Sequence, residues 1–189
     1  MPPKKKFTRD EIVACAFETV RQNGEDFLTA RSLARALGAS TAPLFTAFRS
    51  IEEIHDAVVE KAKALYLRYL EEGLAESLPF KGAGLKYVQF AKDEPMLFRM
   101  LFMRADEDPA TEASHYFPSD FEPEPQVRDT LQSGYGWSEE KAKAIYNHMS
   151  VYAHGLAALY AQGRCVFTDE DVSRMLSEVF TALTRKENL

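Results

Sequence analysis

The chain has 189 residues, of which 46% are hydrophobic and 28% charged, and its net charge is −6 at neutral pH. This length allows one large domain, or a small domain with a larger one, and a sizeable hydrophobic core. No run of eighteen apolar residues occurs and no apolar stretch follows the first lysines, so we expect neither a membrane span nor a signal peptide, and a cytoplasmic protein. Cys15 and Cys165 are expected to be free thiols.

Charge is distributed unevenly along the chain. Residues 1–50 contain eight basic and five acidic side chains, a net charge of +3, which leaves −9 for residues 51–189. A uniformly acidic protein would bind the phosphates of nucleic acid poorly, whereas a basic segment on an acidic body can bind them alone. We therefore expect a nucleic-acid-binding domain at 1–50 and a separate body at 51–189.

The basic segment contains a predicted helix from about residue 8 to residue 24. Thr8 and Glu11 have the spacing of a capping box, and Asn23 with Gly24 ends the helix. Its apolar residues at helical spacing are Ile12, Val13, Ala16, Phe17 and Val20. This apolar stripe is expected to cover the two shorter helices that follow.

Two short helices joined by a glycine turn are predicted between residues 29 and 50. Thr29 can cap the first helix, Gly38 supplies a left-handed residue that ends it, and Ser40 can cap the second. The inward residues are Leu33, Leu37, Leu44 and Phe48, and the outward residues of the second helix are Thr41, Ala42, Phe45 and Thr46. The pattern is a helix-turn-helix, which reads DNA when its second helix enters the major groove.

A long helix is predicted from Ser50 to about Gly73. Ser50 and Glu53 have the spacing of a second capping box, and apolar residues recur at helical spacing without a break. A continuous helix transmits a tilt that a flexible linker would absorb, so this segment can couple the first domain to the body. The alternative is that it only packs as part of the core.

The run from Thr29 to Ile54 resembles the DNA-binding domain of TetR/AcrR-type transcriptional regulators. In that family a Thr-capped helix, a glycine turn, a short recognition helix and a Phe-Lys/Arg-Ser/Asn-x-Glu-Glu-Leu-like run recur in this order. The last element is present here as Phe48-Arg49-Ser50-Ile51-Glu52-Glu53-Ile54. The resemblance implies an all-α homodimer of about nine helices, in which a three-helix DNA-binding domain is joined by a long helix to a ligand-binding and dimerisation domain.

The expected DNA contacts lie on the first domain. The residues expected at base edges are Thr41, Ala42 and Thr46. The other expected DNA-binding residues, mostly at the phosphate backbone, are Lys4, Lys5, Lys6, Thr29, Arg31, Ser40, Phe45 and Arg49. The expected partner is therefore a double-stranded, palindromic DNA operator.

Two apolar helices are predicted at the start of the body. Gly82-Ala83-Gly84 leads into the first, Asp93-Glu94-Pro95 ends it, and residues 96–104 form the second, which is apolar nearly all round. Such a helix is either core or the wall of a pocket. Residues 87–103, with a Tyr-Val-x-Phe-Ala segment before Pro-x-Leu-Phe-Arg, and the segment His154-Gly155-Leu156 resemble one regulator subgroup, the WHG type.

Residues 105–125 are rich in proline and acidic residues, yet they contain Tyr116, Phe117 and Phe121, so part of this stretch is expected to form a flap over the body. Further helices are predicted around 125–133, from 138 to 163, and from 168 onward. Gly155 lies among alanines, which makes one face of the longest of these helices thin. The last two helices are therefore expected to form a homodimer interface.

The body has more apolar bulk than a small core obviously needs, which favours a pocket for a largely apolar or aromatic molecule. The candidate ligand-binding residues are Phe90, Met96, Met100, Met103, Phe117, Phe121, Tyr146, Met149, Tyr152 and His154. His154 or a tyrosine hydroxyl is expected to orient the ligand.

These patterns predict a repressor that such an effector releases from its operator. One alternative is a constitutive DNA-binding or architectural dimer with a filled core, and a weaker one is an enzyme in the helical body. The sequence contains no phosphate loop, no recognisable nucleophile with a base and no spaced pair of metal ligands, so we expect no catalysis, cofactor or metal.

Overall fold

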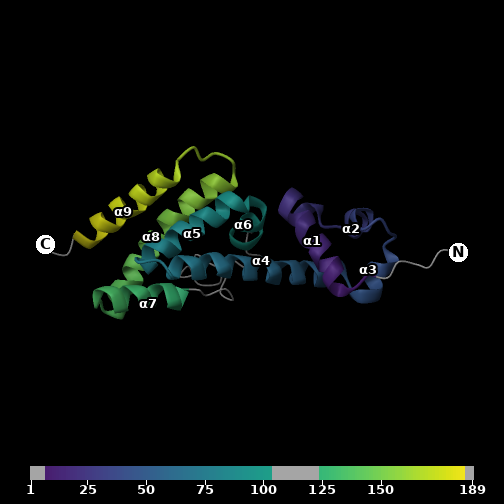
Figure 1. Ribbon diagram of the computed structural model, residues 1–189, viewed down its shortest axis with the longest axis horizontal. Helices are drawn as coiled ribbons and strands as arrows, with labels where there is room; N and C mark the ends of the chain where they lie inside the picture. Colours follow the sequence, from purple (N-terminus) through teal and green to yellow (C-terminus); the bar gives the residue numbers. More distant parts are fainter. Residues whose placement is uncertain (1–6, 104–123, 186–189) are drawn as a thin grey trace, which may run out of the picture.

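The computed structural model describes residues 7–103 and 124–185, and within these ranges the chain is helical without a strand (Figure 1). This confirms the prediction of an all-α fold of about nine helices. The helices are α1 (Arg9–Asn23), η1 (Glu25–Phe27, a 3-10 turn), α2 (Ala30–Ala36), α3 (Ala42–Ala47), α4 (Ile51–Leu74), α5 (Pro79–Asp93), α6 (Pro95–Phe102), α7 (Glu124–Tyr135), α8 (Glu139–Ala161) and α9 (Asp169–Arg185). None of the described helices is both long and apolar enough to cross a membrane.

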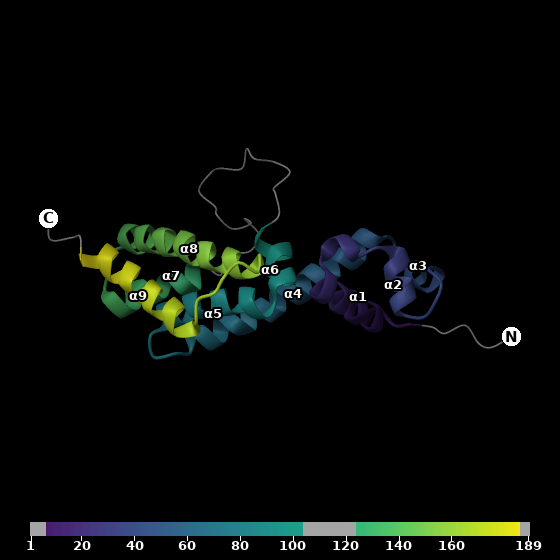
Figure 2. The same cartoon turned by 90° about the horizontal axis from the view of Figure 1, so that it is seen from above.

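The molecule is elongated, with α1–α3 at one end and α5–α9 at the other (Figures 1 and 2). We call the first part the head and the second part the body. Helix α4 runs from the head into the body without interruption. Within the body, α5 packs against α4, α6, α7, α8 and α9, so it is the central helix.

Local capping signals place the helices of the head. Thr8 forms the predicted capping box with Glu11, and Thr29 caps α2 through Ser32. Gly38 follows α2 in the left-handed region, at φ 62°, as predicted. The head core consists of the buried residues Ile12, Ala16, Phe17, Val20, Leu33, Leu44 and Phe48.

The start of α3 differs from the prediction. Thr41, not Ser40, is the N-cap residue, its backbone is already helical, and no side chain caps the helix. Pro43 lies in the first turn and has no N–H group to satisfy, so one of the usual capping donors is missing. Helix α3 is short, and Ser40 lies outside it.

The second predicted capping box is only half formed. Ser50 accepts a hydrogen bond from the Glu53 amide at 3.3 Å, but the Glu53 carboxylate does not return to Ser50. It accepts instead from the Arg49 amide at 2.7 Å and from the Arg9 guanidinium at 3.0 Å. A guanidinium is a stronger partner for a carboxylate than a neutral amide, which explains the difference. Glu53 therefore ties the start of α4 to α1.

Helices α4 and α5 touch backbone to backbone where Gly73 faces Gly82. A Cβ atom on Gly82 would lie 2.1 Å from the Gly73 carbonyl oxygen, which leaves no room for any side chain. The prediction that Gly82 and Gly84 precede the helix was wrong, because α5 begins at Pro79 and contains both. The close packing outweighs the low helix propensity of glycine.

The head is also held to the body by an ion pair. Arg21 of α1 forms two hydrogen bonds with the Glu94 carboxylate, which lies between α5 and α6. The Glu94 side chain is 5% exposed and is the one buried charged residue in the described ranges. The α1–body contact therefore combines apolar packing against α4 and α6 with a buried carboxylate.

Candidate functional site

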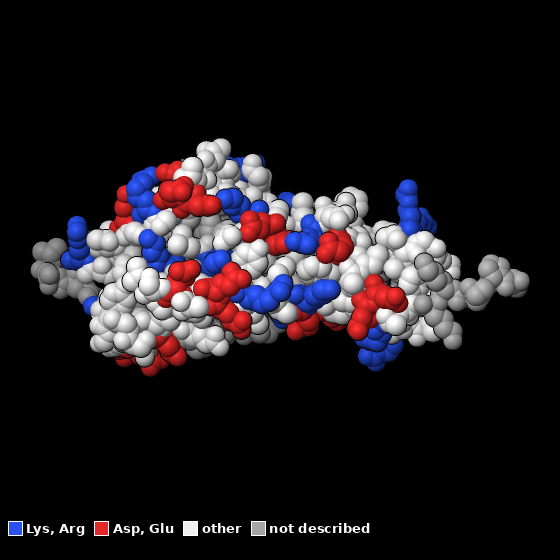
Figure 3. Space-filling view, viewed as in Figure 1, with Lys and Arg blue, Asp and Glu red and all other residues white. Residues whose placement is uncertain are grey.

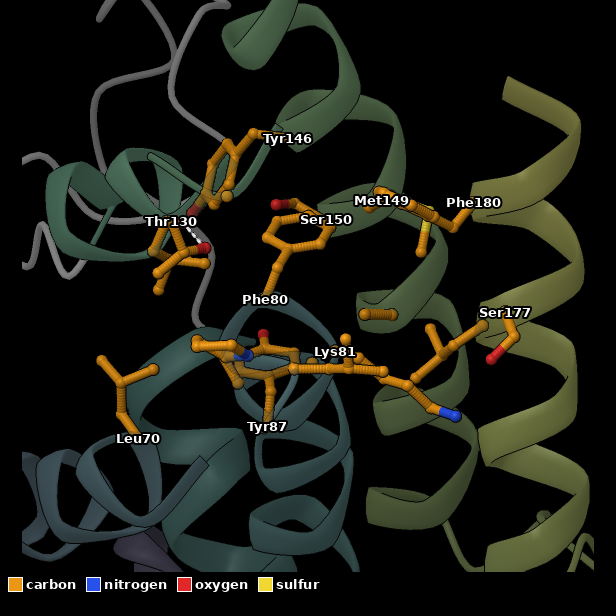
Figure 4. Close-up of a pocket in the computed structure, with 18 of the residues that line it drawn as sticks. Leu70, Phe80, Lys81, Tyr87, Thr130, Tyr146, Met149, Ser150, Ser177 and Phe180 are labelled. Atoms are coloured by element: carbon orange, nitrogen blue, oxygen red, sulfur yellow. Dashed lines mark hydrogen bonds between the residues drawn. The ribbon is translucent and has the colours of Figure 1, made fainter. Parts of the chain in front are cut away.

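A cavity of about 450 Å³ lies inside the body between α4, α5, α6, α7, α8 and α9 (Figure 4). Most of its walls are apolar, and seven aromatic side chains contribute to them: Tyr66, Phe80, Tyr87, Phe102, Tyr135, Tyr146 and Phe180. A volume of this size lies within the range of about 300–1,000 Å³ that is usual for small-molecule sites. The cavity is therefore the candidate ligand-binding site in the part of the chain that the structure describes.

Several hydroxyl groups in the cavity walls already donate their protons to the backbone. Thr130 donates to the Val127 carbonyl at 2.6 Å, and Thr181 donates to the Ser177 carbonyl at 2.7 Å. Ser177 itself donates to the Ser173 carbonyl at 2.8 Å. A hydroxyl that donates in this way retains lone pairs, so these groups can accept a hydrogen bond from a ligand but are poorly placed to donate one.

Tyr87 and His154 form a polar pair behind one wall. The Tyr87 hydroxyl lies 2.9 Å from His154 Nδ1. Burial raises the pKa of Tyr87 well above its ordinary value and lowers the pKa of His154 below 6.5. Both side chains are therefore neutral at neutral pH, and the imidazole tautomer decides which of the two groups donates this hydrogen bond. Tyr87 lines the cavity, and His154 supports it from the second layer.

The structure distributes the predicted ligand-binding residues over several environments. Tyr146 and Met149 line the cavity. Phe90 and Met100 are buried in the core outside its walls, as is most of α6. Met96, Met103, Tyr152 and His154 are partly buried and also lie outside the lining. Phe117, Phe121 and the proposed flap lie outside the described residues.

Sequence reasoning missed most of the aromatic walls. Phe80 was missed because α5 was expected to begin after it, and Phe180 because α9 was assigned only to dimerisation. Tyr66 belongs to the inward stripe of α4, at four-residue spacing from Leu70, and this periodicity was the one signal that could have identified it.

The head presents an exposed surface formed by α3 and its flanking residues. The described residues of the predicted DNA contact are all exposed: Thr29, Arg31, Ser40, Thr41, Ala42, Phe45, Thr46 and Arg49. Phe45 is 49% exposed and the Arg49 side chain 93% exposed. Two hydroxyls are engaged locally, since Thr29 caps α2 and Thr46 donates to the Ala42 carbonyl at 3.0 Å. Lys4, Lys5 and Lys6 lie outside the described residues.

The surface charge differs between the two ends of the molecule. In Figure 3, acidic and basic side chains are interspersed over the visible face of the body, whereas on the head two basic groups project from opposite margins and one acidic group lies close to the lower of them. Several basic residues of the body are paired, including Lys86 with Glu72 at 2.7 Å. Arg31 of α2 is exposed and forms no ion pair with another described residue. This end is therefore the better surface for a polyanion.

Among the described residues, no group of three or more His, Cys, Asp or Glu side chains could hold a metal ion. No protein-family model matches the sequence. No curated protein matches it either.

Proposed function

We propose that this protein is a ligand-responsive transcriptional repressor of the TetR/AcrR type that binds a palindromic operator as a homodimer. The observation that carries the proposal is the arrangement of two sites on one continuous helix. The exposed short helix α3 lies at one end of the molecule, the aromatic cavity lies at the other, and α4 extends from the head to the cavity wall.

The exposed face of α3 suits insertion into the major groove. Thr41, Ala42 and Thr46 are small, so they allow close approach to base edges, and the Phe45 ring can contact a thymine methyl group. Arg31 of α2 and Arg49, which follows α3, are both exposed and supply positive charge for the phosphates. The head core holds α3 in place through Leu44, which is fully buried.

A homodimer through α8 and α9 is supported by an apolar strip on α8. Val151 is 48% exposed, Leu159 is 39% exposed, and Gly155 lies between them with open space beside it. These three residues are four apart, so they share one helix face. On the neighbouring α9, Met175 and Val179 are only partly buried. A twofold pair of such faces matches the symmetry of a palindromic site.

The cavity can influence the head through α4. Tyr66 and Leu70 of α4 form part of the cavity wall, so a ligand contacts this helix directly. At its other end α4 is joined to α1 through Glu53 and Arg9. An effector that binds one tilt of α4 more tightly shifts the population of that tilt, and two linked heads then lose their match to the two half-sites. A body without a cavity would have favoured the constitutive DNA-binding dimer.

Selection from a random duplex library with the purified protein tests the proposal. We expect enrichment of an inverted repeat, and light scattering should give a dimer at micromolar concentration. Gly155→Arg should convert the dimer to a monomer and lower operator affinity without unfolding the chain, because Gly155 is exposed. Failure to enrich any sequence, or a wild-type monomer on the operator, would refute the proposal.

A further inference from the structure

Lys81 is the one charged residue among the described residues that line the cavity. It belongs to the first turn of α5 and is partly buried. Figure 4 shows its side chain extending along the floor of the cavity toward Ser177 of α9. The lining contains no aspartate or glutamate, so no acidic side chain of the cavity wall is present to neutralise Lys81.

Neighbouring lysines of the same helix are neutralised, and Lys81 is not. Lys86 pairs with Glu72 at 2.7 Å, and Lys92 pairs with Asp169 at 2.6 Å. No described residue forms an ion pair with Lys81, although it also lines the adjacent polar groove. A partly buried ammonium group without a counter-ion is a binding site for an anion, because the anion replaces lost hydration.

The rest of the cavity restricts the remainder of the ligand. Its walls are mainly apolar, with seven aromatic side chains, and the hydroxyls of Thr130, Ser177 and Thr181 already donate to backbone carbonyls. An engineered cavity of about 150 Å³ takes one benzene, so a volume of 450 Å³ has room for about 18 non-hydrogen atoms. The available space suits one apolar body with a single anionic group at its end.

We propose that the cavity binds a monoanionic amphipathic molecule, with a carboxylate paired to Lys81 and an apolar body against the aromatic walls. The inference rests on the proposed function only in treating this cavity as the effector site. It narrows the ligand class from any apolar molecule to apolar carboxylates, and it assigns the orienting role to Lys81 in place of His154.

The single tryptophan of the chain gives a direct measure of occupancy. Trp137 stacks on Tyr135 with ring centroids 4.6 Å apart and lies 6.1 Å from the Phe180 ring, and both of these neighbours line the cavity. Three probes of equal chain length, dodecanoate, dodecanol and dodecylammonium, are titrated against Trp137 fluorescence without DNA. They share the same alkyl chain and carry an anionic, a neutral and a cationic head group, respectively.

Wild-type protein should bind dodecanoate at least tenfold more tightly than dodecylammonium. Lys81→Met should raise the Kd of dodecanoate by about tenfold, the lower range for a hydrogen bond to a charged group, and leave dodecanol within about twofold. Lys86→Met, which removes the same charge from the same helix outside the lining, should change neither Kd. Lys81→Arg should retain the preference for the anion, which also verifies that position 81 tolerates substitution.

Equal losses in the Lys81→Met and Lys86→Met proteins, or no preference for the anion, would overturn the assignment. Operator titration of the same samples separates this inference from the proposed function. If dodecanoate binds through Lys81 and operator affinity does not change, the regulator proposal fails and the ligand class stands. If the protein binds its operator specifically but no probe occupies the cavity, only the ligand class is refuted.

Discussion

Removing the Arg21 guanidinium would leave the Glu94 carboxylate buried without a counter-ion. Arg21 Nε donates to Glu94 Oε2 at 2.7 Å, and a second nitrogen donates to the other carboxylate oxygen, so the pair is bidentate. Breaking a fully buried pair from one side costs about 3–5 kcal/mol. Because the Arg21 side chain is 44% exposed and water can replace part of it, we expect Arg21→Met to lower the free energy of unfolding by about 2–3 kcal/mol.

The two partners should respond unequally. Glu94→Gln removes the buried charge but keeps an oxygen that accepts from Arg21, and the guanidinium that remains can be hydrated, so we expect a loss of about 1 kcal/mol. The double variant should lose less than the sum of the two single losses, by at least 1 kcal/mol, because it contains no unpaired buried carboxylate. Urea unfolding of all four proteins measures this coupling.

An internal control uses the second acidic neighbour of Arg21. Glu18 lies 3.5 Å from the same guanidinium, but its side chain is 51% exposed. Glu18→Gln should therefore change the free energy of unfolding by less than about 0.5 kcal/mol. Additive effects of Arg21→Met and Glu94→Gln within about 0.5 kcal/mol would show that the pair does not stabilise the head against the body, and would refute the reasoning.

Three further predictions follow from other features. Gly82→Ala should destabilise the fold by about 3 kcal/mol in urea unfolding, because the added Cβ would overlap the α4 backbone. Gly84→Ala should stabilise the fold by about 0.5–1 kcal/mol, because the atom nearest to its added Cβ would be 3.8 Å away. Equal effects of the two substitutions would contradict the close contact at Gly82. The lowered pKa of His154 means that the unfolded chain takes up this proton first as the pH falls, so the free energy of unfolding should be unaffected above about pH 7 and decline below the ordinary pKa of 6.5. His154→Gln should remove this part of the decline. An unchanged pH profile in the variant would refute the assignment to His154. In operator titrations, Arg49→Ala should lower the affinity for all DNA sequences alike and reduce the slope of log affinity against log salt by about one unit, whereas Thr46 variants should change the preferred sequence. Arg68→Ala, on the body part of α4, is the control. An unaltered ranking of sequences in the Thr46 variants would exclude base readout by Thr46.

Much of the fold could be predicted from short-range signals. Thr8 and Thr29 each cap a helix as predicted, and Ser138 and Thr168 cap the helices that were predicted to start at 138 and 168. A capping hydrogen bond depends on residues only two or three positions away. The break at Pro95 was also predicted, since proline acts through its own ring and backbone. All the groups that produce such a signal lie within a few residues of each other, and the tertiary packing of this fold is consistent with these signals.

The failures involve partners that are distant in the sequence. Glu53 was expected to complete a box with Ser50, but Arg9 lies close to it only in the folded head. Gly82 was interpreted as the lead-in to a helix because its low helix propensity is visible locally, whereas its contact with Gly73 is not. In both cases a contact with a residue distant in the sequence outweighs the local signal.

The sequence predicted that the body contains a pocket, but not most of the residues that line it. A pocket in an aromatic, Met-rich body was expected, and a cavity is present in the body, but of the predicted residues that the structure describes only Tyr146 and Met149 line it. Phe90 lies against Tyr66 and Tyr69 in the core instead, at centroid distances of 5.3 and 5.4 Å. Which side of a helix faces a cavity depends on how the helices cross, and periodicity alone does not specify that angle.

The glycine contact between α4 and α5 also sets a length scale for motion. From Gly73 to Ile51, α4 extends about 33 Å at a rise of about 1.5 Å per residue. Gly73 is the point at which the α4 backbone touches α5, and a rotation of ~5° about this point would displace the far end of α4 by ~3 Å. This arc is close to the spacing of about 3.4 Å between adjacent base pairs. Under the proposed function, a small rotation about the Gly73–Gly82 contact would therefore be enough to shift α3 by about one base-pair step relative to a duplex.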